Sequence, residues 1–268
     1  TSFALPREAT TCRGHETIES QIINLIRDGK LPHALIFSGI EGVGKATTAF
    51  RVARYLLKHG ARQEDAGASL FGDPLPILLP DTMDMAADDP VFRQVASGGH
   101  SDLLTVERPM DEKKGKQKDH VDVDSARAVV PFLRMKAAKE GGWRVVILDD
   151  ADTMNRNAQN AILKVLEEPP ERTLLILIAH RLGAMIPTIL SRCRTIEFYP
   201  LAKESFADLM GLSGSDLELL YAFSGGSIGQ ALKLRQSGGL ESLDSVVGFL
   251  RDYPRWDWIK LHGFAEAT

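Results

Sequence analysis

Short runs of apolar residues alternate with amphipathic stretches along most of the chain. The runs have the length of strands and predict strands at residues 33–38, 103–106, 144–148, 174–179 and 195–198. Apolar residues at helical spacing predict helices at residues 17–27, 45–57 and 154–168, and a further helix that begins at 121–125. Because strands that alternate with helices favour a parallel sheet covered on both faces, we predict an α/β fold for residues 1–200.

The pattern changes after Pro200, where only helical spacing remains. We predict helices at residues 203–210, 216–223, 227–236 and 240–250, with glycine or serine between them. These helices define a small, all-helical domain over residues 201–268.

Two segments of the first domain break the regular pattern. Prolines at positions 74, 76, 80 and 90 interrupt residues 61–100, so we predict an irregular insertion with one or two short helical pieces. Packing of its apolar residues must hold this insertion together; they include Leu70, Phe71, Leu75, Ile77 and Leu78. Residues 107–120 carry mixed charge, for which a solvated loop is favoured over a nucleic-acid patch.

Composition and charge narrow the possible classes of protein. Apolar residues make up 44% of the chain and charged residues 25%, which argues against a mainly disordered or fibrous protein. The 32 basic and 36 acidic residues give a formal charge of −4, so we expect no large basic surface for nucleic acid. The two cysteines, Cys12 and Cys193, exclude a disulfide scaffold and a four-cysteine zinc site within the chain.

The apolar runs are too short to cross a membrane as a helix, the longest being residues 174–179. The first residues, Thr1–Arg7, lack the basic start and long apolar run of a secretory signal. With so few cysteines we expect a reducing, cytoplasmic compartment and no membrane partner.

Residues 39–45, with the sequence GIEGVGK, fit the phosphate-loop pattern G-x-x-x-x-G-K. In such a loop the glycines let backbone N–H groups turn towards phosphate oxygens, and the following helix adds its positive N-terminal end. The lysine, here Lys45, neutralises the β and γ phosphates. The alternative is an incidental turn, which the predicted strand before the loop and the helix after it disfavour.

The position after the lysine departs from the pattern. It normally holds Ser or Thr, whose hydroxyl binds magnesium, whereas this chain has Ala46. Thr47 lies about 100° further round the helix and should not reach the same point. The fold signal is therefore intact, while the metal-handling signal is damaged. The candidate nucleotide-binding residues of this degenerate site are Gly39, Gly42, Gly44, Lys45, Thr47 and Asp149.

Three aspartates follow the predicted strand at 144–148. Asp149, at the strand end, is placed to hold magnesium through water. Asp150 stands where phosphate-loop ATPases carry the Glu that polarises the attacking water. The alternative is that these aspartates cap the next helix. We favour the nucleotide role for Asp149 and the helix cap for Asp152.

Arg192 lies in the stretch 189–193, after a turn that begins near Pro187. An arginine on a loop at a subunit edge can reach a neighbour's γ-phosphate and stabilise the charge of the transition state. The physics of the sequence alone favours the simpler alternative of a solvated surface charge. We expect Cys193 to be a small buried residue rather than a reactive one.

These motifs together resemble the delta-prime family of bacterial DNA polymerase III clamp-loader subunits. The resemblance runs from about Arg7 to Leu234. It rests on residues 33–47, 149–155 (DDADTMN), 157–170 (NAQNAILKVLEEPP), 188–193 (TILSRC) and 225–232 (GGSIGQAL). The Gly-Gly-Trp at 141–143 and Ala46 resemble the alphaproteobacterial version.

The resemblance implies an AAA+ phosphate-loop domain with a five-stranded parallel sheet, followed by a helical lid. It also implies a collar domain, which a chain that ends at Thr268 is too short to contain. Arg192 is implied to be an arginine finger for the adjacent motor subunit. The implied partners are the motor (tau/gamma) and delta subunits, with the sliding clamp and primer-template DNA reached through the DNA polymerase III holoenzyme.

Several positions that ATP-hydrolysing relatives use are altered in this chain, namely Ala46, Asp150, Ala179-His180 and Gly229, the last in place of a lid arginine. Residues 58–102, where many family members carry a zinc module, contain no cysteine. We therefore predict a non-motor subunit with weak or absent ATP or ADP binding and no zinc. The main alternative is an active AAA+ ATPase, which the intact Lys45 and Asp149 support. An independent DNA-binding module is disfavoured by the negative charge.

Overall fold

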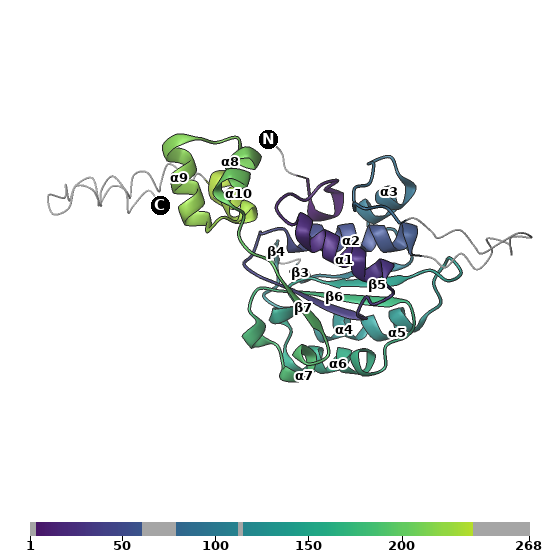
Figure 1. Ribbon diagram of the computed structural model, residues 1–268. Helices are drawn as coiled ribbons and strands as arrows, with labels where there is room; N and C mark the ends of the chain where they lie inside the picture. The colour runs from purple at the N-terminus through teal and green to yellow at the C-terminus, as the bar shows by residue number, and fades with distance from the viewer. Residues whose placement is uncertain (1–3, 61–78, 112–114, 238–268) are drawn as a thin grey trace, which may run out of the picture. The chain divides into compact units, whose positions relative to one another are not determined.

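A sheet of five parallel strands forms the centre of the computed structural model, which describes residues 4–60, 79–111 and 115–237 (Figure 1). The strands are β1 (Ala34–Ser38), β2 (Leu103–Val106), β5 (Arg144–Leu148), β6 (Thr173–Ala179) and β7 (Arg194–Glu197). Their order across the sheet is β2-β5-β6-β1-β7, and every neighbouring pair is parallel. The predicted α/β class and all five predicted strands are confirmed, within one residue at each end.

The three central strands of the sheet consist mainly of apolar residues. Every residue of β1, β5 and β6 is buried, as expected for apolar strands covered on both faces. β7, at one edge, buries only Ile196 among its four residues. Because parallel strands point the same way, their carboxyl ends all meet at one edge of the sheet.

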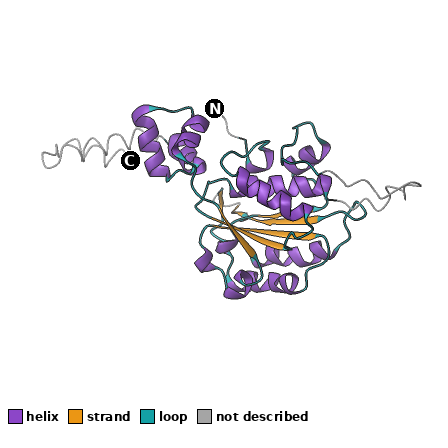
Figure 2. Ribbon diagram, in the orientation of Figure 1, coloured by secondary structure: helices purple, strands orange, loops and turns teal. Residues whose placement is uncertain are grey.

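Helices cover both faces of the sheet (Figure 2). One face carries α1 (Glu16–Arg27), α2 (Lys45–His59) and α3 (Pro90–Ala96). The other carries α4 (Val123–Arg127), α5 (Val129–Arg134), α6 (Arg156–Glu167) and α7 (Pro187–Leu190). The core under this second face joins apolar residues of β5 and β6 with those of α4, α5 and α6.

The structure differs from the predicted elements at three places. The helix expected from 121 is two helices, because α4 ends at Arg127 and α5 starts afresh at Val129. The helix expected from 154 begins at Arg156, since Asn155 caps it through a hydrogen bond from Ala158 N to its Oδ1, 2.9 Å long. The mixed-charge loop contains a small antiparallel pair, β3 (Met110–Asp111) with β4 (Lys116–Gln117).

The chain divides into two compact units, the first made of Thr1–Ile40 and Gly44–Tyr199 and the second of Glu41–Val43 and Pro200–Thr268. The second unit contains α8 (Lys203–Met210), α9 (Gly214–Ser224) and α10 (Ile228–Gln236). Within it, Gly229 N donates to Gly42 O at 2.9 Å, and Ser227 Oγ donates to Glu41 O at 2.7 Å. These contacts explain why the tip of the phosphate loop groups with the helices of this unit.

Two sequence predictions lie outside the described residues: the helix at 240–250 and the packing of the apolar residues between 70 and 78. Among the residues that the structure does describe, no helix is long and apolar enough to span a membrane.

Candidate functional site

The phosphate loop lies at the carboxyl end of β1, between Ser38 and the first residue of α2, as the sequence predicts. Gly39 adopts a φ of +145°, and a Cβ atom at this position would lie 2.3 Å from the carbonyl oxygen of Phe198. That oxygen belongs to the backbone and cannot move aside, so only glycine fits there. The close approach of the chain beyond β7 therefore fixes the first glycine of the motif.

Lys45 points back into its own loop. The residue is 3% exposed, and its Nζ donates to the carbonyl oxygens of Gly39 and Ile40, both at 2.7 Å. A third contact, 2.8 Å long, joins Nζ to Nδ1 of His180. An ammonium group carries three N–H donors, and these three acceptors match them one for one. The lysine that the motif assigns to phosphate is thus engaged by the protein itself.

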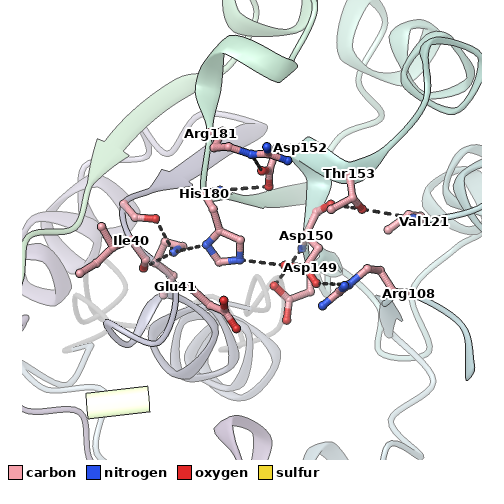
Figure 3. Close-up of polar contacts among 12 residues, drawn as sticks. Ile40, Glu41, Arg108, Val121, Asp149, Asp150, Asp152, Thr153, His180 and Arg181 are labelled. Atoms are coloured by element: carbon pink, nitrogen blue, oxygen red, sulfur yellow. Dashed lines mark hydrogen bonds and ion pairs between the residues drawn. The ribbon is translucent and has the colours of Figure 1, made fainter. Parts of the chain in front are cut away.

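His180 extends this contact to the acidic end of β5 (Figure 3). Its Nε2 lies 2.8 Å from Oδ1 of Asp150, and Nε of Arg108 donates to Oδ2 of the same carboxylate at 2.6 Å. The hydrogen bond to Asp150 raises the pKa of His180 above its ordinary value. Burial disfavours the charge of Asp150, yet the contacts with His180 and Arg108 outweigh it and lower the pKa of that carboxyl.

Asp149 lies beside this string of contacts, at the end of β5. Its Oδ1 accepts a hydrogen bond from the backbone N–H of Asp150, at 3.0 Å. Burial, together with the charge of Asp150, raises the pKa of Asp149 from 3.8 to about 6. The strand-end position agrees with the motif, and the nucleotide role of Asp149 stays a prediction.

The helix cap predicted for Asp152 is wrong, since Asn155 caps α6. The buried carboxylate of Asp152 instead accepts a hydrogen bond from the backbone N–H of His180, at 3.0 Å. Its second oxygen lies 3.5 Å from Nε of Arg181 (Figure 3). Asp152 therefore joins the turn after β5 to the end of β6, and holds the backbone of His180 in place.

The other residues predicted for the loop lie close to Lys45 in sequence. Gly44 has a φ of +113° and immediately precedes α2, while Ala46 and Thr47 are half-buried in the first turn of that helix. Gly42 groups with the second unit. With Lys45 engaged internally and no hydroxyl at position 46, the residues present do not fit a magnesium-bound nucleotide.

Two residues near the loop were not identified from the sequence. Arg108 follows β2 by two residues, and the signal for it was available because the ends of parallel strands converge. His15 is 4% exposed and packs its ring edge-on against Phe198, with centroids 4.9 Å apart. A Cβ atom on Gly44 would lie 3.1 Å from that imidazole. Nothing in the local sequence marks His15 for this position.

Arg192 lies in the turn between α7 and β7 and is exposed. Its Nη1 donates to the carbonyl oxygen of Thr188 at 3.0 Å, and its Nη2 lies 3.0 Å from Oε1 of Glu167. Both partners are on the surface, so the guanidinium is held loosely and stays open to solvent. The structure brings no other predicted site residue to this turn.

Cys193 matches the expectation of an inert residue. It is half-buried against the core under α6, and burial raises the pKa of its thiol to about 12. Burial likewise raises the pKa of Cys12, whose Sγ lies 3.5 Å from Oγ1 of Thr48. Over the described ranges, no cluster of three or more His, Cys, Asp or Glu side chains is arranged to hold a metal ion.

Known proteins resemble this chain over most of its length. Residues 82–202 match the family described as "DNA polymerase III, delta subunit". DNA polymerase III subunit delta' of Pseudomonas aeruginosa is 34% identical over 222 residues, which cover 80% of this chain and 59% of that protein. The subunit delta' of Bacillus subtilis is 28% identical over 192 residues, covering 70% of this chain and 48% of that protein.

Relatives also occur outside bacteria. Human replication factor C subunit 5 is 27% identical over 241 residues, covering 87% of this chain and 57% of that protein. The chain thus spans about half the length of the curated relatives that it matches. Among solved structures, a DNA polymerase III gamma subunit-related protein of Thermotoga maritima aligns with 91% of this chain and 64% of its own, at 19% identity and a TM-score of 0.49.

Proposed function

Because the chain belongs to the delta-prime family of AAA+ clamp-loader subunits, we propose that it acts as a non-motor subunit of the DNA polymerase III clamp loader. In this role it helps load the sliding clamp onto primed DNA, alongside the motor (tau/gamma) and delta subunits. The subunits delta' of two bacteria and a human replication factor C subunit, all similar to this chain, support the proposal. The alphaproteobacterial origin suggested by residues 141–143 stays a prediction.

The observation that carries the proposal is the internal engagement of Lys45. A motor subunit needs this lysine on the β and γ phosphates and a hydroxyl on the magnesium ion. Here the ammonium contacts Gly39, Ile40 and His180, and Ala46 supplies no hydroxyl. We therefore propose weak or absent binding of ATP and ADP. Because residues 58–102 contain no cysteine, we also propose that there is no structural zinc.

The second candidate function is that of an active AAA+ ATPase. It is favoured by the retained Lys45, which follows the loop after β1, and by Asp149, which directly follows β5. The contacts of the Lys45 ammonium with Gly39, Ile40 and His180 argue against an active ATPase. A lone DNA-binding module remains disfavoured, because the formal charge of the chain is −4.

Arg192 is the residue that we propose to act on a neighbour. An exposed guanidinium can reach the γ-phosphate bound by an adjacent motor subunit and stabilise the charge that develops there. Exposure at the end of α7 and loose tethering by Thr188 and Glu167 suit such a reach. In this proposal residues 1–200 are the AAA+ domain, residues 201–268 the lid, and the cytoplasm the compartment in which they work.

The test separates the two candidate functions in purified components. The full-length protein alone is expected to show no magnesium-dependent ATP turnover above background. Omitting it from a loader reconstituted with the motor and delta subunits is expected to abolish clamp loading onto primed DNA. Robust turnover by the protein alone would establish the ATPase, and loading that proceeds without it would remove the clamp-loader role. Elemental analysis for zinc checks the metal.

A further inference from the structure

The contacts from Lys45 to Arg108 follow the strand order of the sheet. Arg108 follows β2, Asp150 follows β5, His180 follows β6, and Lys45 follows the loop after β1. The sheet runs β2-β5-β6-β1 in that same order. Each side chain therefore contacts the one from the next strand, and together they cross four strand ends (Figure 3). We name these four side chains the strand-end relay.

Donors and acceptors alternate along the relay without conflict. Arg108 and Lys45 can only donate hydrogen bonds, and the Asp150 carboxylate can only accept them. His180 stands between Lys45 and Asp150, so its Nδ1 must accept and its Nε2 must carry the proton. The backbone of His180 is fixed by Asp152 at 3.0 Å, which orients the imidazole between its two partners.

A polyphosphate that enters the loop has to displace one of the three partners of Lys45, and His180 is the only side chain among the three. The ammonium has no fourth N–H to offer, because its three donors match Gly39 O, Ile40 O and His180 Nδ1. The imidazole is 24% exposed and Asp150 18%, so water compensates their loss only in part. The carboxylate of Asp150 lies 2.8 Å from Nε2 of the imidazole and is itself held by Arg108, so it keeps the imidazole in position against Lys45.

We propose that His180 is the residue that closes this phosphate loop to polyphosphates, by linking Lys45 to Asp150 in place of a bound ligand. The loop behind it retains its glycines and its helix N-terminus, so the site is latent rather than lost. The proposal rests on the proposed weak nucleotide binding of the chain and assigns that weakness to one side chain. It predicts that removing the imidazole restores binding of a triphosphate group.

Binding measurements on the full-length protein test this assignment. The probes are ATP, with and without magnesium, and inorganic tripolyphosphate, which lacks the nucleoside. Relative to the unmodified protein, His180→Ala is expected to bind both probes about ten-fold more tightly or better. Magnesium should add little, since Ala46 remains. Adding Lys45→Met to His180→Ala should remove the gain, because the gain requires the released ammonium.

A matched control is His33→Ala. His33 is also half-buried and also makes a hydrogen bond, from Nε2 to the carbonyl oxygen of Leu166 at 3.1 Å, but it stands outside the relay. This variant should leave probe binding unchanged. A folded His180→Ala variant with no gain, or an equal gain in His33→Ala, would overturn the assignment to His180 while leaving the proposed function standing. Tight binding by the unmodified protein would overturn both.

A second measurement needs no substitution. Nitrogen-15 NMR of the unmodified protein, labelled at histidine, reports which ring nitrogen of His180 carries the proton. The relay requires the proton on Nε2 and none on Nδ1 once the imidazole is neutral, so the spectra are recorded at a pH above the pKa of His180, which Asp150 raises. A proton on Nδ1 would break the link to Lys45 and overturn the proposal, even if His180→Ala fails to fold.

Discussion

The phosphate loop and the turn of Arg192 each hold a cation of the kind that phosphate chemistry uses, and they hold it in opposite ways. Lys45 is 3% exposed and surrounded by three acceptors from its own unit. The side chain of Arg192 is 35% exposed and is tied to one carboxylate that is itself half exposed. Internal contacts thus take up the first cation and leave the second available. This difference is the physical basis of the proposal that the chain does not turn over ATP itself and supports turnover in a neighbour.

The largest effect is expected at Arg192. In the reconstituted loader, Arg192→Ala should lower hydrolysis at the adjacent motor site by roughly 10³- to 10⁵-fold, the usual contribution of an arginine finger. Bulk ATP turnover should fall only by a fraction, because other motor sites keep their own fingers. Single-site turnover and clamp loading are the measurements. Arg192→Lys keeps the charge but loses the planar fork, so it should rescue poorly.

The control for this experiment is Arg194→Ala, an exposed arginine two residues further along in β7. It should leave turnover and loading unchanged. Normal clamp loading with Arg192→Ala would show that Arg192 is only a solvated charge, and would erase the difference between the two regions.

Two arginine–glutamate pairs, one buried and one exposed, are expected to differ in the same way in what they contribute to the free energy of unfolding. Arg51 and Glu19 form a buried pair, with side chains 2% and 9% exposed, whereas Arg192 and Glu167 are 35% and 50% exposed. Glu19→Ala should lower the free energy of unfolding by about 3–5 kcal/mol, because it leaves a guanidinium buried without its main partner. Glu167→Ala should lower it by less than about 1 kcal/mol. Denaturant titration of both variants measures the contrast; equal losses would contradict it.

The parts that the sequence predicts are those where one local pattern suffices. Apolar runs predict the strands. The spacing of the glycines and Lys45, between a strand and a helix, predicts the phosphate loop. The strand-end relay could not be predicted in this way. Arg108, Asp150 and His180 lie far apart in sequence, and they meet only because the order β2-β5-β6-β1 places their strand ends side by side.

The cap predicted for Asp152 is wrong for the same reason. Asp152 stands close to the start of a helix and fits the pattern of a cap, but its carboxylate is taken by the backbone of His180, 28 residues away. Asn155 then makes the cap. Local rules identify residues that are able to cap, whereas the tertiary contacts decide which of them does.

The pH dependence of stability tests how strongly the Asp149 carboxyl, at the end of β5, is buried away from water. Burial raises the pKa of Asp149 from 3.8 to about 6, so ionising this carboxyl opposes folding. Since each pKa unit corresponds to about 1.4 kcal/mol, the opposition reaches about 3 kcal/mol once the pH exceeds the folded pKa. Asp149→Asn stays neutral and escapes this penalty.

The sign follows from the direction of the shift. Below the unfolded pKa both proteins carry a neutral group, and their free energies of unfolding should agree. As pH rises from about 4 to 6, the unmodified protein should lose stability relative to Asp149→Asn, and above that the difference should level off. Urea titrations at several pH values measure the difference. If the difference in free energy of unfolding between the two proteins stays constant across this range, the Asp149 carboxyl is exposed to water and not buried.

The smallest effect is expected at Glu167, the carboxylate that tethers Arg192. Its Oε1 lies 3.0 Å from Nη2, and an exposed pair of this kind is worth less than about 1 kcal/mol. To act on a neighbour, Arg192 must leave Glu167, so removing the charge with Glu167→Gln should raise turnover at the adjacent site by no more than about five-fold. Stability should not change, since the amide fills the same space. The single-site assay used for Arg192→Ala measures this effect. A loss of ten-fold or more would mean that Glu167 holds Arg192 in its working position, and that the turn is less open than its exposure indicates.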